Sequence, residues 1–235
     1  MEDPSPLVRL NQEIVECRAC PRLVAWREQV AREKRAAFRD ETYWGRPVPS
    51  FGDPAARLLI VGLAPAAHGA NRTGRMFTGD RSGEWLFRSL HRAGFANQPD
   101  ATRRDDGLRL DDAWLTAAVH CAPPDNKPTP PERRRCGRFL ERELSILLPG
   151  LRVVVALGSF GWNQLFRTAG ALGIPVPRPR PRFGHQAEVP LFRDDPRRIR
   201  VLGSYHPSQQ NTFTGRLTEP MFDAVWSRAA ELCRD

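Results

Sequence analysis

The sequence has 235 residues, of which 40% are hydrophobic, which is enough for a packed core and excludes disorder as the main state. Its formal net charge of +9 indicates a polyanionic partner such as nucleic acid, because arginine and lysine release counterions when they neutralise phosphates. No apolar run approaches the roughly 20 residues needed to span a bilayer, and the opening MEDPSPLVRL lacks the pattern of a secretion signal, so we expect a cytoplasmic protein without membrane attachment.

The order of hydrophobic patterns along the chain predicts the fold class. Residues 7–39 have apolar side chains at helical spacing, interrupted at CRACP, which predicts two helices. Short apolar runs typical of strands buried on both faces follow at residues 57–63, 113–119, 151–158 and 199–204. Helical patterns lie at residues 82–93, 131–148, 160–168 and 218–233. We therefore predict one α/β domain over residues 1–235, a three-layer αβα sandwich with a mostly parallel four-stranded sheet.

Distinctive sequences follow the predicted strands. GLAPAAHGANRTGRMFTGD comes after the first strand, HCAPPDNKP after the second, GSFGW after the third and SYHPSQQNTFTGR after the fourth. In open parallel sheets, ligands bind outside the carboxyl ends of the strands, so these loops are predicted to share one site. Residues 174–198, rich in proline and arginine, cannot form a regular helix and are predicted to form a surface loop.

Four of the five cysteines have spacing that indicates a metal site. Cys17 and Cys20 form a CxxC pair, and Cys121 and Cys136 lie far along the chain, so the four thiolates could join two segments around one centre. Zinc and an iron-sulfur cluster both accept four thiolates, and the spacing leaves them open. Free buried cysteines or a redox pair are the alternatives, although a redox CxxC usually opens a helix directly after a strand. Cys233 has the register of an apolar core residue on the last helix.

Taken together, GLAP, MFTGDRSG, CAPPDN and HPSQQNTFTGRLT resemble the motifs of the uracil-DNA glycosylase superfamily. The resemblance is closest to its iron-sulfur family 5 and runs from Cys17 to about Leu217. It implies the glycosylase αβα fold and a structural 4Fe-4S cluster on the four cysteines, which clips the N-terminal helices of residues 7–39 to the sheet. It also implies a glycosylase without a nucleotide cofactor that releases uracil, hypoxanthine or xanthine from DNA and leaves an abasic site. Lys127 is the only lysine in a motif loop, so we expect a monofunctional enzyme without a lyase step.

The resemblance assigns roles to individual residues. Phe77 matches the ring that stacks on the extruded base, and Asp80 and Asn126 match the polar residues that hold or activate water. His206 matches the histidine that contacts the base, and Asn211 lies in the loop that penetrates the duplex. Taken alone, however, Asp80 could cap a helix, Asn126 could serve a turn and His206 could be a structural histidine.

The chain departs from its sister families at two substrate positions. Ala64 lies where most of those families carry a polar residue that activates water, and no asparagine stands near Ala117 to read a pyrimidine edge. A site without such hydrogen bonds rejects analogues weakly, so we expect a permissive enzyme. Candidate phosphate contacts are the arginines at positions 72, 75 and 216 and those within residues 178–200.

Other functional classes remain open from the residues alone. A metal-stapled nucleic-acid-binding protein without catalysis would have the same charge and the same cysteines. A zinc nuclease or deaminase would need histidine or carboxylate ligands, and no HxE sequence partners either cysteine pair. The four motifs favour a glycosylase that works as a monomer on DNA in the nucleoid.

Overall fold

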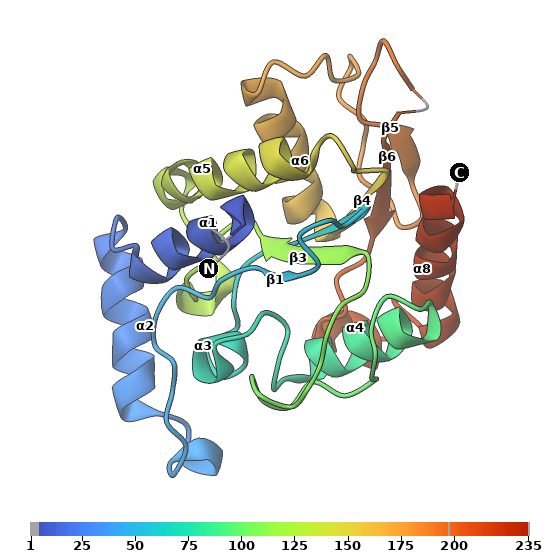
Figure 1. Ribbon diagram of the computed structural model, residues 1–235. Helices are drawn as coiled ribbons and strands as arrows, with labels where there is room; N and C mark the ends of the chain where they lie inside the picture. Colours follow the sequence, from blue (N-terminus) through green and yellow to red (C-terminus); the bar gives the residue numbers. More distant parts are fainter. Residues whose placement is uncertain (1–4, 197, 235) are drawn as a thin grey trace.

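A six-stranded sheet forms the centre of the computed structural model, which describes residues 5–196 and 198–234 (Figure 1). Its four central strands are parallel, in the order β3 (Ala113–Ala117), β2 (Leu58–Gly62), β4 (Val153–Leu157) and β6 (Arg200–Ser204). A short antiparallel strand extends each edge, β1 (Phe51–Gly52) beside β3 and β5 (Glu188–Pro190) beside β6. The prediction of a mostly parallel sheet is confirmed, whereas the predicted number of strands was too low.

The two edge strands escaped prediction because neither has an apolar run. Both are only half-buried, and β5 lies within the segment predicted to be a loop, residues 174–198. Their place in the sheet comes from backbone pairing with a longer neighbour, which leaves no pattern in the sequence. Residue 197 of this segment lies outside the described residues.

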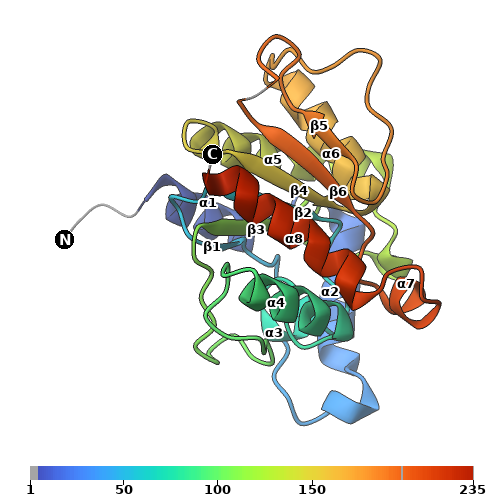
Figure 2. The same ribbon diagram turned by 90° about the vertical axis from the view of Figure 1, so that its right-hand side faces the viewer.

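Helices cover both faces of the sheet, as Figure 2 shows. One face is covered by α4 (Arg81–Arg92) and α8 (Glu219–Arg234), and the other by α1 (Pro6–Glu16), α5 (Pro130–Leu147) and α6 (Gly158–Ala171). The helix α2 (Pro21–Glu33) lies at the end of the molecule where α1 and α5 also meet (Figure 1). Four short helices complete the chain: η1 (Ala36–Phe38), α3 (Ala70–Thr73), η2 (Pro124–Asn126) and α7 (Gln209–Phe213). All six long helices had been predicted.

The central strands are buried on both faces because their side chains alternate between two cores. Leu58 and Ile60 of β2 pack in the core beneath α4 and α8, whereas Leu59 and Val61 pack in the core beneath α5 and α6. Every residue of β2, β3 and β4 is buried. No helix within residues 5–196 and 198–234 has the length and hydropathy to cross a membrane.

A buried polar network ties α5 to the sheet. The fully buried carboxylate of Glu143 accepts hydrogen bonds from Trp114 Nε1 at 3.1 Å and Thr116 Oγ1 at 2.7 Å. Ser50 Oγ donates to Thr116 Oγ1 at 2.9 Å, and the side chain of Asn11 bonds both backbone polar groups of Ser50. One carboxylate therefore fixes helix α5, strand β3 and, through Ser50, helix α1 relative to one another.

We expect Glu143→Ala to lower the free energy of unfolding by about 3 kcal/mol, because it leaves two buried donors without an acceptor. Glu143→Gln retains one acceptor oxygen and should cost less. Denaturant unfolding followed by circular dichroism measures both effects. Glu141→Ala on the same helix is the control, since that side chain is partly exposed. Equal stability of Glu143→Ala and the control would show that the network contributes nothing.

Candidate active site

The loops that follow β2, β3 and β6 surround one cavity of about 540 Å³, which we call the main cavity. The first loop and the start of α4 supply most of the wall, Asn126 comes from the second loop, and His206 comes from the fourth. The loop after β4 lies behind the wall, where a Cβ on Gly158 would be 3.6 Å from that of His206. The prediction that the loops converge is therefore confirmed for three of the four loops, which line the main cavity.

Phe77 and His206 form the aromatic part of the main cavity. Their ring centroids are 5.6 Å apart, and the ring planes are tilted by 30°. Phe77 has a φ of +52°, a conformation that costs an ordinary residue roughly 1–3 kcal/mol. Two glycines make room for it, since a Cβ on Gly62 would be 2.9 Å from the ring and one on Gly83 would be 1.7 Å from the Phe77 carbonyl oxygen.

His206 is held as a neutral imidazole at the cavity. Its ring reaches the cavity surface but is otherwise enclosed by protein, and this desolvation lowers its pKa to about 4. Asn211 Nδ2 donates to the His206 carbonyl oxygen at 2.8 Å, and the Asn211 backbone N–H bonds Ser208, the N-cap of α7. Asn211 does not line the main cavity, so its side chain supports the histidine loop.

Asp80 both caps a helix and lies in the wall of the main cavity. Its Oδ1 accepts from Gly83 N at 3.0 Å as the N-cap of α4, and the carboxylate also lines the main cavity. Burial raises the pKa of Asp80, although the backbone N–H groups of Gly83 and Ser82 oppose the shift. A Cβ on Gly69 would lie 2.0 Å from Oδ2, so any residue other than glycine at position 69 would collide with the carboxylate.

Asn126 lies in a turn with positive φ values and lines the same two cavities as Asp80. Asp125 and Asn126 have φ values of +53° and +56°, a region that Asn and Asp tolerate better than most residues. The Asn126 side chain makes no hydrogen bond with another described residue and is exposed. Asp80 and Asn126 both line a second cavity of about 450 Å³, the side cavity, whose wall also contains Trp26 and His68. Asp80 and Asn126 therefore belong to the walls of both the main cavity and the side cavity.

The two substrate alanines lie in different places. Ala64 lines the main cavity, where its side chain is only an apolar methyl group. Ala117 is the last residue of β3, is only 1% exposed and is not part of the cavity lining. Ala117 belongs to the buried core against which Phe77 packs.

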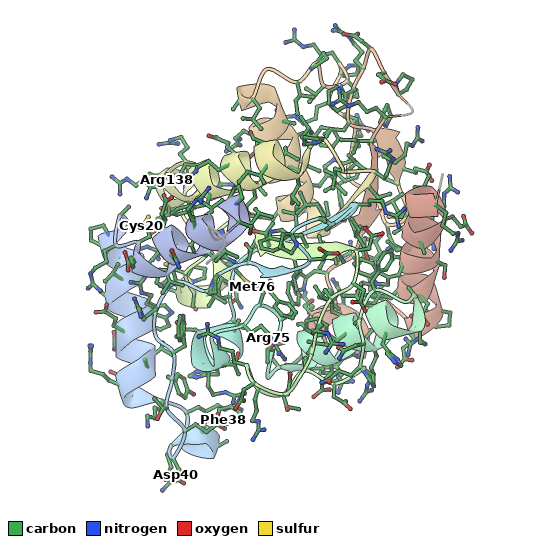
Figure 3. The ribbon with its side chains drawn as sticks, viewed as in Figure 1. Cys20, Phe38, Asp40, Arg75, Met76 and Arg138 are labelled. Atoms are coloured by element: carbon green, nitrogen blue, oxygen red, sulfur yellow. The ribbon has the colours of Figure 1, made fainter. Side chains whose placement is uncertain are left out.

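The four predicted metal-binding cysteines gather in one cluster. Cys17 and Cys20 come from the junction of α1 and α2, Cys121 from the loop after β3, and Cys136 from α5, and they pack together with Phe139. Figure 3 shows Cys20 and Arg138 at the end of the molecule where α1, α2 and α5 meet. Cys233 lies apart in the core beneath α8, as expected.

Nitrogen donors surround these sulfur atoms. Arg27 Nη1 donates to Cys121 Sγ at 2.8 Å, and the His120 backbone N–H donates to Cys136 Sγ at 3.3 Å. Arg138 Nη2 lies 3.6 Å from Cys17 Sγ. Burial raises the pKa of the Cys121 thiol to about 11, so these donors alone do not ionise it, whereas metal coordination would. Among the described residues, no group of three or more His, Cys, Asp and Glu is arranged to hold a single metal ion.

Two predicted phosphate contacts are wrong. Arg72 is 8% exposed and pairs with Glu41, and Arg75 is 4% exposed and makes two 2.7 Å hydrogen bonds to Asp106. Although burial opposes it, the Arg75 hydrogen bonds help to lower the pKa of Asp106 to about 2. Both arginines therefore brace the first loop from inside.

Sequence reasoning missed three exposed residues near the cavities. Arg35 and Arg81 line the side cavity and form no ion pair with a described carboxylate. Phe213 at the end of α7 is 67% exposed, and the guanidinium of Arg81 lies 4.4 Å from its ring centroid. Arg216, which was predicted, is exposed and stacks on Tyr205 at 4.6 Å. Arg81 lies in the MFTGDRSG motif and Phe213 in HPSQQNTFTGRLT, so both had a sequence signal, whereas Arg35 had none.

Comparison with known proteins identifies the family. Residues 49–230 match the Uracil DNA glycosylase superfamily. The chain is 54% identical over 226 residues to the type-5 uracil-DNA glycosylase of Mycobacterium bovis, covering 96% of this chain and 81% of that protein. It is 53% identical over 221 residues to the type-5 enzyme of Thermus thermophilus, covering 94% and 95% of the two chains.

A type-4 uracil-DNA glycosylase of Archaeoglobus fulgidus is more distant, at 28% identity over 79% of this chain and 81% of that protein. The type-5 relatives match almost the whole chain at about twice that identity. With the four loop motifs gathered at one edge of a parallel sheet, the chain belongs to the uracil-DNA glycosylase superfamily and, within it, to the type-5 enzymes.

Proposed function

We propose that this protein is a monofunctional DNA glycosylase that hydrolyses the N-glycosidic bond of uracil and other deaminated bases, leaving an abasic site. The observation that carries the proposal is the meeting of Phe77, Asp80, Asn126 and His206 around one cavity of about 540 Å³. This volume lies within the range of small-molecule sites and suits a purine as well as a pyrimidine, which supports hypoxanthine and xanthine as further substrates.

The chemistry follows from the placement of these groups. The extruded base stacks on Phe77, and a water molecule is held between the carboxylate of Asp80 and the side-chain oxygen of Asn126. As the bond between C1′ and the base nitrogen breaks, its electron pair stays on the base, where a neutral His206 donates a hydrogen bond. The water oxygen then bonds C1′, and its proton passes to Asp80.

Two features favour hydrolysis over a lyase reaction and over simple binding. None of the described residues that line the main cavity is a lysine, so no amine is available to form a Schiff base. Asp80 has a raised pKa and Phe77 a strained backbone, and such features cluster at reactive sites more often than at passive binding surfaces. The alternative, a metal-stapled nucleic-acid-binding protein, requires neither.

The DNA interface is supported by charge. The chain has a net charge of +9, and Arg35 and Arg81 lie beside the two cavities, where the phosphates next to an extruded nucleotide would pass. We also propose that the protein acts as a monomer. The basic charge also supports association with the nucleoid in the cytoplasm.

We further propose that Cys17, Cys20, Cys121 and Cys136 hold a structural 4Fe-4S cluster and that residues 1–235 form one domain, to which the cluster clips α1 and α2. Four thiolates suit zinc as well as an iron-sulfur cluster. The resemblance to the iron-sulfur family 5 enzymes and the nitrogen donors at three of the sulfur atoms support the iron-sulfur cluster. The cluster would supply cohesion between segments and no reaction step. Zinc without iron in protein purified without air would contradict this.

Alkali cleavage of DNA duplexes that contain uracil, hypoxanthine or xanthine tests the function. We expect base release from all three, and a decrease of about 100-fold or more in Asn126→Ala, because water positioning is lost while DNA binding survives. Lys127→Ala is the matched control, since its side chain lies next to Asn126 in the chain but does not line the main cavity. Intact strands with every base would refute catalysis and leave the binding protein as the better reading.

The pH dependence of single-turnover base release tests Asp80. Asp80 must be ionised to accept the proton of water, and burial raises its pKa. Base release should therefore fall as the pH drops through the Asp80 pKa, which lies above the ordinary aspartate pKa of about 3.9. Asp80→Asn should be slow and should lack this acid limb. His206, with a pKa of about 4, should add no inflection near the ordinary histidine value of about 6.5. An acid limb that persists in Asp80→Asn at a pH well above the His206 pKa of about 4 would assign the base to another group.

Phe213 is proposed to enter the duplex in place of Asn211, whose side chain is engaged with the His206 loop. An exposed aromatic ring beside Arg81, which lines the main cavity, can occupy the gap that an extruded base leaves. We expect Phe213→Ala to slow release from duplex DNA by about tenfold, and release from single strands much less, because unstacking costs a few kcal/mol only in the duplex. Leu172→Ala, another exposed apolar side chain, is the control. Equal losses on both substrates would contradict this role.

A further inference from the structure

Arg27 is a buried cation beside the cysteine cluster. It lies on α2 and is 2% exposed, on the same helix that Cys20 begins as N-cap. Its Nη1 donates to Cys121 Sγ at 2.8 Å, and both terminal nitrogens lie 3.4 Å from the Cys17 carbonyl oxygen. The guanidinium therefore contacts both cysteine segments.

Among the residues that the structure describes, only one long ion pair, to a carboxylate shared with another arginine, opposes this charge. This carboxylate belongs to Glu28, whose Oε1 lies 4.0 Å from Arg27 Nη2, but Glu28 is partly exposed and bonds Arg18 at 2.5 Å. Arg27 Nε is buried without any hydrogen-bond partner. A buried guanidinium without a balancing charge costs several kcal/mol, so an arginine in this position needs a further anion nearby.

The other charges around the cysteines lie at the rim. Arg138 approaches Cys17, Arg135 interacts with Cys20, and both side chains are exposed, while Glu132 pairs with Arg22 beside Cys20. Solvent screens these groups. Arg27 is the one described cation that meets a cysteine sulfur away from solvent.

We propose that Arg27 is the internal counter-charge of the cluster, a positioning residue that balances the net negative charge of four thiolates around the metal core and bonds the sulfur of Cys121. This inference rests on the cluster proposed above. Hydrogen bonds and positive charge at the ligand sulfurs stabilise the reduced cluster more than the oxidised one, because reduction adds negative charge. Arg27 should therefore raise the reduction potential and slow the loss of iron.

We expect substitution of Arg27 to leave the packing of α2 against α3 in place, so that its effect on the cluster can be measured. The contact between α2 and α3 uses the backbone carbonyl of Arg27, to which Asn71 Nδ2 donates at 3.3 Å, and a new side chain leaves that carbonyl in place. Arg27→Gln removes the charge and keeps a polar donor. Arg27→Lys keeps the charge and loses the forked donor.

The experiment compares wild type, Arg27→Gln, Arg27→Lys and Arg138→Gln, all purified without air. Iron and sulfide content, loss of absorbance at about 400 nm with a chelator, and the midpoint potential of the cluster are measured. Arg27→Gln should lose iron about tenfold faster and have a more negative potential, since partners of metal ligands typically contribute tenfold or more to metal retention. Arg27→Lys should keep a potential near that of wild type, and Arg138→Gln should resemble wild type because its charge is screened.

The outcomes separate this inference from the cluster itself. Wild type that contains no iron would overturn the cluster and, with it, this role. Wild type with a full cluster and Arg27→Gln with unchanged potential and iron release would overturn the role of Arg27 alone. If Arg27→Gln does not fold, Arg27→Lys decides: a wild-type potential supports a charge effect, and a strongly lowered potential refutes it.

Discussion

Parallel pairing of β3, β2, β4 and β6 brings the carboxyl ends of four strands to one edge of the sheet. The loops that follow these strands must then meet, although their sequences lie far apart in the chain. Hydrophobic burial maintains this arrangement, since the strand side chains alternate between two helix-covered cores. The active site therefore depends on a sheet that takes no direct part in the chemistry.

Close approach is the second constraint on the site. Gly62, Gly69 and Gly83 each lie where a methyl group would collide with Phe77 or Asp80. The two functional side chains are thus fixed by neighbours that lack side chains, and their positions are tightly determined. Phe77 and Asn126 adopt positive φ values at the same edge, so part of the backbone strain lies where a base would be bound.

The central strands and long helices were predictable because each contributes an apolar run or a helical periodicity. The edge strands β1 and β5 contribute neither, since their pairing depends on a neighbour already in place. The roles of arginines were the least predictable. Arg72 and Arg75 occur in a motif loop but are buried in ion pairs, whereas Arg35 lies outside every motif and lines the side cavity. Asn211 was placed in the correct loop, but only the structure shows that its side chain bonds the His206 carbonyl.

The position of Asp80 links the end of a helix to the chemistry of the cavity. As a carboxylate it completes the N-terminus of α4, where its negative charge is favoured by the helix dipole, and under the proposed mechanism the same oxygens receive a proton during each turnover. Protonation removes the charge that the helix end favours. A general base at this position would therefore lose part of its cap interaction each time it takes up a proton, and the helix end would favour return of that proton to solvent.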